Sequence, residues 1–168
     1  MSNVETAISI DMYYGTKDIT SFPVTEKTPH FRDIHISNIS ATDVVNSVEI
    51  TGLPEAPIKN ISIVNSSFKA TNGFEVKFVE NFKLSNVTIE CEKGNPLTID
   101  HAEIVDLDDF GTGAFTPNEP VIQLNSVNDI FIRNCRVSKD TDIFLKSKNS
   151  REIEMKNNWL RNAQVLRD

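Results

Sequence analysis

Residues 61–68 read Ile-Ser-Ile-Val-Asn-Ser-Ser-Phe, and this stretch decides the fold because its pattern recurs along the chain. An apolar residue stands at the first and third positions, Asn at the fifth, and an apolar or small residue at the eighth. The copies begin at residues 34, 61, 82, 105, 130 and 153, and the copy at 105 is degenerate, with Asp109 in place of Asn. These starts are 27, 21, 23, 25 and 23 residues apart, a repeat of about 24 residues.

Alternation with a period of two predicts a β-strand with one buried face. A second short apolar strand follows each Asn, at residues 48–50, 74–78, 97–99, 121–124 and 143–145. Strand, Asn turn and second strand at near-constant spacing predict an all-β, right-handed parallel β-helix, a pectin-lyase-like solenoid. We expect about six to seven coils in a single domain over residues 1–168.

The Asn positions predict an asparagine ladder. Coils stack about 4.8 Å apart, so one position of the repeat forms a vertical column. Asn tolerates left-handed backbone and its amide can bond the coil above or below. We expect these side chains to face inward, which would make the sequons at Asn38, Asn60, Asn65 and Asn86 poor glycosylation acceptors.

Composition excludes several classes of protein. The 168 residues carry 17 Lys and Arg against 24 Asp and Glu, a net charge of −7, which argues against nucleic acid as a partner. It also disfavours an anionic ligand unless positive charge gathers in one groove. No apolar run approaches the roughly 18 residues of a membrane span, so no membrane partner is expected. Cys91 and Cys135 stand at different repeat offsets in separate coils, which predicts two free thiols.

The candidates for chemistry are few. One cluster of acidic residues, at 100–109, could supply paired carboxylates for glycoside hydrolysis or bind Ca²⁺. The alternation of inward and outward residues along its strand instead favours a solvated edge with one ladder residue, Asp109. His30 and His35 have no further ligands at suitable spacing, so no metal or other cofactor is expected. The acidic cluster consists of Asp100, His101, Glu103, Asp106, Asp108 and Asp109.

Three aromatic residues are candidates for a sugar-binding platform. Tyr13 and Tyr14 end the first predicted strand, just before Gly15. Trp159 falls at an outward offset of the last copy, where a hydrophobic lid on the terminal coil is the favoured interpretation over an exposed platform.

Several segments resemble the C-terminal coils of the polygalacturonases, glycoside hydrolase family 28. The segments are residues 8–15 (Ile-Ser-Ile-Asp-Met-Tyr-Tyr-Gly), 28–39, 52–61 and 82–89, and the likeness extends over nearly the whole chain. The resemblance implies a parallel β-helix and inverting hydrolysis of the α-1,4-linked galacturonic acid of pectin, without a metal. It also implies a periplasmic or extracellular location, although no signal-peptide pattern opens the chain.

The catalytic motifs Asn-Thr-Asp, Gly-His-Gly and Arg-Ile-Lys of that family are absent here, and Asp108-Asp109 lies too far toward the C-terminus to be its Asp-Asp pair, so no catalytic residue carries over. The resemblance assigns substrate contact to Tyr14, assisted by Tyr13, with Lys17, Arg32 and Lys59 as the nearest basic residues. We therefore expect a polygalacturonase-like C-terminal portion that is inactive alone and contacts pectin or galacturonan oligosaccharides. The alternative is a non-catalytic glycan-binding or purely structural β-helix. In either case the first coil would have an open N-terminal end, covered by a second copy or another partner.

Overall fold

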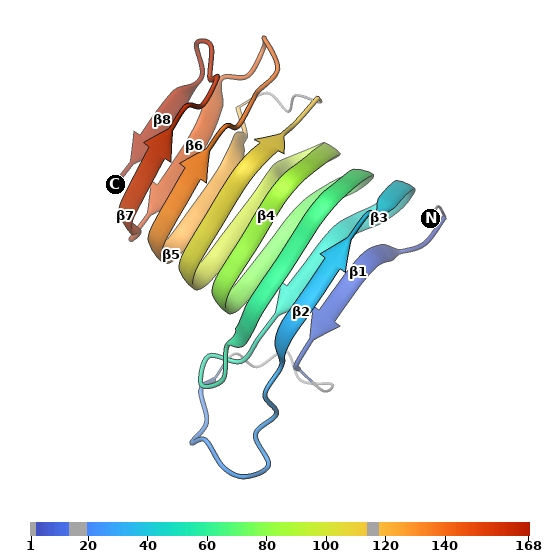
Figure 1. Ribbon diagram of the computed structural model, residues 1–168, viewed down its shortest axis with the longest axis vertical. Coiled ribbons are helices and arrows are strands. Elements are labelled where there is room, and N and C mark those ends of the chain that lie inside the picture. The colour runs from blue at the N-terminus through green and yellow to red at the C-terminus, as the bar shows by residue number, and fades with distance from the viewer. Residues whose placement is uncertain (1–2, 14–19, 114–117) are drawn as a thin grey trace.

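The computed structural model describes residues 3–13, 20–113 and 118–168, which form a stack of β-coils (Figure 1). In this described part of the chain no helix is long and apolar enough to cross a bilayer. The strands are β1 (Thr6–Asp11), β2 (Arg32–Ser37), β3 (Ser40–Thr51), β4 (Ile58–Gly111), β5 (Pro120–Arg133), β6 (Ile143–Lys148), β7 (Arg151–Lys156) and β8 (Gln164–Arg167).

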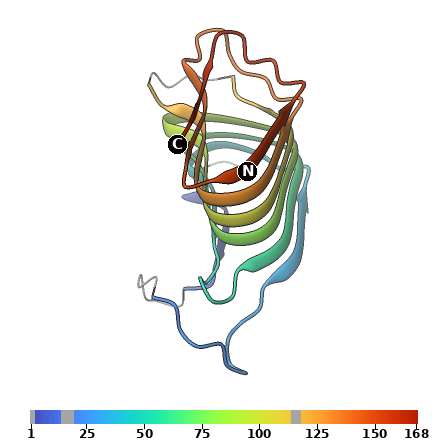
Figure 2. The same ribbon diagram turned by 90° about the vertical axis from the view of Figure 1, so that its left-hand side faces the viewer.

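The long strand β4 winds through successive coils, and Figure 2 shows these coils stacked one on another. The strands pair in parallel, and the repeat starts lie in register: Ile34 pairs with Ile61, and Ile130 pairs with both Val105 and Ile153. The repeat read from the sequence is therefore the coil of the structure, and the predicted all-β parallel β-helix is confirmed.

The helix has about five turns, fewer than the six to seven predicted. Six repeat starts enclose only five complete turns, because each turn lies between two starts. At the two ends, β1 pairs only with β3 and β8 only with β6, so each adds one strand and not a whole coil.

The inward positions of the repeat form one continuous core. Phe82 and Leu84 are completely buried, and Phe68 meets Phe74 edge to face with ring centroids 4.9 Å apart. The equivalent residues of the outermost coils are only half-buried, because no further coil covers them. These residues are Ile34 and Ile36 at the N-terminal end and Ile153 and Met155 at the C-terminal end.

Each coil bends at residues with left-handed backbone, where φ is positive. Such residues recur in vertical columns, and the first two columns keep the intervals of the repeat. Asn and Asp dominate them because their short polar side chains tolerate this conformation at little cost. The first column is Asp33, Asn60, Asn81, Ile104, Asp129 and Glu152, the second is Asn38, Asn65, Asn86, Asp109, Asn134 and Asn157, and the third is Phe78, His101, Ser126 and Asn149.

The predicted asparagine ladder is present, but the expectation that it faces inward is wrong. Asn65 and Asn86 are exposed, and the amide of Asn86 donates to the side-chain oxygen of Asn65 at 3.0 Å. A left-handed residue breaks the alternation of the strand, so the next residue turns inward instead: Ser66 is 6% exposed. The sequons at Asn38 and Asn60 are exposed too, so burial gives no reason to discount any of the four.

A second ladder runs along the first column, one residue before each repeat start. Asn81 donates to the side-chain oxygen of Asn60 at 2.9 Å, and Asn60 donates to Asp33 at 2.7 Å. In the next coil Ile104 takes this place with a φ of 59° and 45% of its surface exposed. A β-branched residue in left-handed backbone is strained, whereas four of the other five residues of this column are Asn or Asp.

We predict that Ile104→Asn stabilises the protein. The change relieves left-handed strain, removes no buried apolar group and allows the ladder to continue from Asn81. We expect the free energy of unfolding to rise by about 1 kcal/mol, measured by urea denaturation. Ile104→Val keeps both the branching and the backbone, and should give no gain. An Asn variant less stable than the wild type would contradict this explanation.

Candidate functional site

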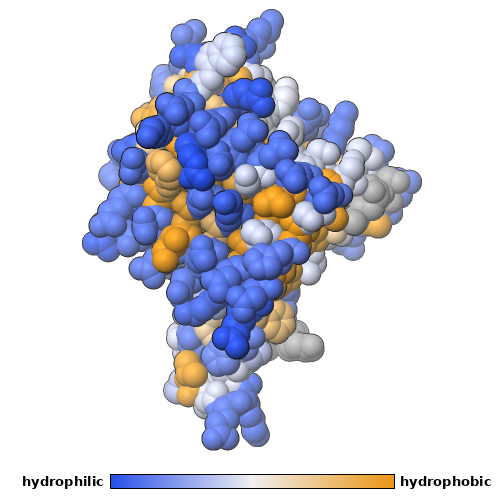
Figure 3. Space-filling view, viewed as in Figure 1, coloured by the Kyte–Doolittle hydropathy of each residue, from blue (hydrophilic) through white to orange (hydrophobic). Residues whose placement is uncertain are grey.

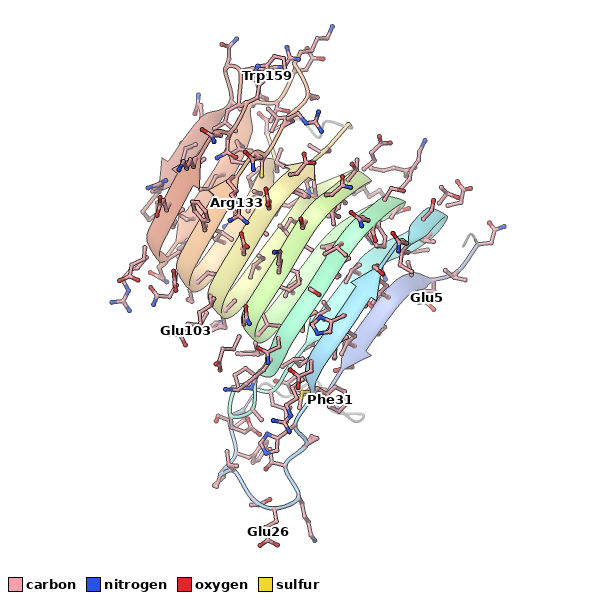
Figure 4. All side chains as sticks on the ribbon, in the orientation of Figure 1. Glu5, Glu26, Phe31, Glu103, Arg133 and Trp159 are labelled. Atoms are coloured by element: carbon pink, nitrogen blue, oxygen red, sulfur yellow. The ribbon has the colours of Figure 1, made fainter. Side chains whose placement is uncertain are left out.

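Two members of the predicted acidic cluster, Asp106 and Asp108, form an acidic pair on the outer face of the coils, where Arg133 of β5 binds both carboxylates. Arg133 Nη1 is 2.6 Å from Asp106 Oδ1, and its Nη2 is 3.1 Å from Asp108 Oδ2. Lys83 Nζ lies 3.8 Å from Asp106. Figure 4 labels Arg133 on this face, and Figure 3 shows the same face as largely hydrophilic. The pair is therefore part of an ion-pair network.

The network also fixes the charge of the acidic pair. The Asn134 amide, 2.8 Å from Asp108, and the charge of Arg133 lower the pKa of Asp108 below its usual 3.8. A glycosidase acid needs the opposite, a carboxyl whose pKa is raised so that it carries a proton near neutral pH. Asp108 is suited to holding a coil together and not to donating a proton.

We predict that Arg133→Gln flattens the acid limb of the stability curve. A lowered folded-state pKa makes Asp108 stabilising above the usual value near 3.8, and this contribution is lost as the pH falls through the folded-state pKa. At neutral pH the free energy of unfolding of the variant should be about 1 kcal/mol below that of the wild type. Between about pH 5 and about pH 2.5 the free energy of unfolding should fall less in the variant than in the wild type. Urea denaturation across this range measures it.

The control is Arg151→Gln, which removes an exposed charge outside this network. It should leave the acid limb as in the wild type. Parallel curves for Arg133→Gln and the wild type would contradict a contribution of Arg133 to the lowered pKa of Asp108, beside the larger contribution of Asn134.

The other members of the predicted acidic cluster are dispersed. Asp109 takes the ladder place with a φ of 51° and pairs with Arg136 at 3.3 Å. Asp100 lies 2.8 Å from the ring nitrogen of His101, whose ring stacks on Phe78 with centroids 5.1 Å apart. Within the described residues no group of three or more His, Cys, Asp or Glu could hold a metal ion, so the calcium alternative gains no support.

The remaining predicted residues are described only in part. Tyr14 and Lys17 lie outside the described residues. Tyr13 is half-buried and its phenolic oxygen is buried. Arg32 and Lys59 are paired neighbours in β2 and β4, each beside a carboxylate: Asp33 at 3.8 Å and Glu80 at 2.5 Å, respectively.

The other two histidines, His30 and His35, have different surroundings. His35 Nδ1 lies 2.8 Å from the hydroxyl of Ser62 in the adjacent coil, and His30 is exposed. Cys91 and Cys135 are thiols and not a disulfide, as predicted, and both are buried. Burial raises the pKa of Cys135 to about 12, so this thiol is not a nucleophile.

A shallow groove lies at the corner where the chain turns after the repeat strands that begin at residues 34, 61 and 82. It runs beside the second column of left-handed residues. Its walls are amides and hydroxyls at equivalent places in successive coils. Neighbouring coils lie about 4.8 Å apart, so the groove offers a regular series of hydrogen-bonding groups along the solenoid axis. The polar lining consists of Asn38, Ser40, Asn65, Ser66, Ser67, Asn86 and Thr88.

Trp159 stands at the same repeat position in the last coil, and the interpretation as a hydrophobic lid on the terminal coil is wrong, because Trp159 is not among the residues that pack against the core. Its side chain is among the exposed apolar ones, with 62% exposure, while Met155 and Leu160 pack against the core instead. The Arg161 guanidinium carbon lies 5.1 Å from the Trp159 ring centroid. Backbone bridges connect Trp159 to Arg136 in the preceding coil, and Figure 4 shows Trp159 near the end of the stack.

Sequence reasoning missed the residues that fix this wall. Asn158 spans two coils: its oxygen accepts from the Cys135 backbone N–H and its amide donates to the Ile132 carbonyl, both at 2.9 Å. The only signal in the sequence is the doubled Asn before Trp159. The first left-handed column was also missed, although Asn60 and Asn81 visibly precede their repeat starts.

Comparisons with protein-family models, with curated proteins and with solved structures found no match for this chain. The functional argument therefore depends on the residues themselves.

Proposed function

We propose that this chain is a non-catalytic, glycan-binding β-helix, similar to the C-terminal coils of a polygalacturonase and inactive by itself. The observation that carries the proposal is the axial groove of amides and hydroxyls. Such groups are the usual hydrogen-bonding partners of sugar hydroxyls, and the coil spacing repeats them at a constant interval. A linear oligosaccharide lying along the groove would meet equivalent groups at each coil.

The state of the acidic residues supports binding over catalysis. Inverting hydrolysis needs an acid with a raised pKa and a base that activates water. Asp106 and Asp108 instead share one arginine, and the pKa of Asp108 is lowered. Pectin degradation by this chain alone would need carboxylates other than this pair.

The distribution of charge makes an anionic glycan acceptable despite the net charge of −7. Residues 111–168 contain nine Lys and Arg against seven Asp and Glu, whereas residues 1–110 contain eight against seventeen. The C-terminal coils are therefore slightly basic, whereas the groove itself lies in the acidic part of the chain, so an anionic glycan is favoured where it extends beyond the groove onto the C-terminal coils.

We predict that the purified chain binds polygalacturonate without releasing reducing ends. Isothermal titration and a reducing-sugar assay on the same preparation measure both. Ser67→Glu places a negative charge in the groove and should weaken binding at least about fivefold, which corresponds to about 1 kcal/mol of binding free energy. Gln123→Glu adds the same charge beside Lys146 on another face and should bind as the wild type does. Absent binding, or clear release of reducing ends, would contradict the proposal.

We also propose that the N-terminal end is covered by a second copy of the chain. Ile36 is half-buried there, whereas Ile63 in the next coil is fully buried, and β2 pairs with β4 alone. Continued head-to-tail stacking would align Arg151 with Arg32 and Glu152 with Asp33, like charge on like charge. A closed dimer with facing N-terminal ends avoids these clashes and hides the unpaired edge.

We predict a dimer in sedimentation velocity. Ile36→Lys should shift it to monomer, because the lysine would bury its charge in the interface. Met155→Lys makes a similar change at the C-terminal end and should leave the dimer intact. A wild-type monomer at all concentrations would contradict self-association and leave another polypeptide as the covering partner.

A further inference from the structure

We infer that Trp159, Arg161 and Arg136 form a binding site for a uronic acid residue in the C-terminal coils, on the same corner of the solenoid as the polar groove. This inference rests on the proposed glycan binding and names the part of the chain that would recognise the sugar carboxylate. It assigns recognition to the opposite end of the chain from Tyr13 and Tyr14.

The site combines an exposed aromatic ring with two cationic side chains. Trp159 is 62% exposed, more than any other large apolar residue in the described part of the chain. Arg161 lies over its ring at 5.1 Å, close enough for a cation–π contact. Arg136 occupies the equivalent place one coil earlier; its side chain is 68% exposed and its guanidinium turns toward Asp109 of the coil before.

The backbone that carries these side chains is held firmly. Trp159 N donates to the Cys135 carbonyl at 2.8 Å, and Arg136 N donates to the Phe110 carbonyl at 3.1 Å. Asn158 adds its two hydrogen bonds to the coil below. A fixed platform loses little conformational entropy on binding, which favours affinity from a small contact area.

The charges distinguish these arginines from the structural one. Arg133 is 24% exposed and bridges two carboxylates. Arg161 has no carboxylate within 4.0 Å among the described residues, and Arg136 has one exposed partner, Asp109, at 3.3 Å. An exposed ion pair contributes about 0–1 kcal/mol, so a ligand carboxylate can displace Asp109 at little cost.

These features fit a uronic acid better than other ligands. The apolar face of a pyranose ring can stack on Trp159, while its carboxylate accepts charge-assisted hydrogen bonds from guanidinium groups. A neutral sugar would use only the ring. A nucleic acid could also stack its bases on Trp159, so single-stranded DNA is included in the test as a competing ligand.

The position of the site connects it to the groove. Backbone bridges join Gly111, Arg136 and Trp159 in consecutive coils, and Ser40 pairs with Ser67 at the same place earlier in the stack. Trp159 and Arg136 therefore continue, in the last coils, the column of residues whose hydroxyls line the groove earlier in the stack.

The test is titration of the full chain with trigalacturonic acid, followed by Trp159 fluorescence and calorimetry. We expect Trp159→Ala to weaken binding at least tenfold and Trp159→Phe to recover part of it. Arg161→Gln should weaken binding of trigalacturonic acid about fivefold and leave binding of neutral galactotriose unchanged. Arg151→Gln, which removes an exposed charge elsewhere in the last coil, should bind as the wild type does. Thermal melting of each variant checks the fold.

The outcomes separate the two proposals. Wild-type binding that persists unchanged in Trp159→Ala and Arg161→Gln overturns this site but leaves glycan binding by the groove in place. Equal loss with galactotriose and trigalacturonic acid in Arg161→Gln overturns carboxylate recognition. No wild-type binding overturns the proposed function itself, and tighter binding of single-stranded DNA than of trigalacturonic acid overturns the ligand class.

Discussion

The structure depends on one constraint, the stacking of equivalent positions in successive coils at a spacing of about 4.8 Å. Each corner must reproduce the corner below it, so a residue that bends the chain through left-handed backbone recurs at the intervals of the repeat. The same constraint limits side-chain volume where coils approach closely. A Cβ on Gly73 would lie 2.2 Å from the backbone oxygen of Asn95, and one on Gly52 equally close to that of Phe78, so neither position accepts a larger residue.

The left-handed corners also determine which side chains reach the surface. Because a left-handed residue breaks the alternation of the strand, its own side chain turns outward and the core continues from the next residue, as at Asn65 and Ser66. The ladder amides then bond one another on the outside. This leaves a polar corner along the whole stack, and the groove follows directly from it. The feature that bends the coil and the feature proposed to bind glycans are thus the same column of residues.

The sequence was sufficient for the fold because the fold is periodic. Inward positions such as Phe82 and Leu84 were predicted from a period of two inside a period of about 24, and both are buried. The direction of the ladder was predicted wrongly, because alternation was extended through Asn65 although left-handed backbone resets it. Trp159 was misjudged for a related reason: its exposure depends on how Asn158 fixes the turn, which is a contact between coils that periodicity does not encode.

The function was harder to predict from the sequence than the fold, because the resemblance and the composition both describe the whole chain and not its individual coils. The net charge of −7 disfavoured an anionic ligand, yet the excess of acid lies in residues 1–110 and the C-terminal coils are slightly basic. Within those coils the burial of each arginine decides its role. Arg133 is enclosed by two carboxylates and stabilises the stack, while Arg161 stands beside an exposed indole with no carboxylate at hand among the described residues. A solenoid makes this division natural, because each coil presents the same backbone frame and only the side chains at one position differ. Specificity can then be placed in a single coil without disturbing the stacking that holds the others together.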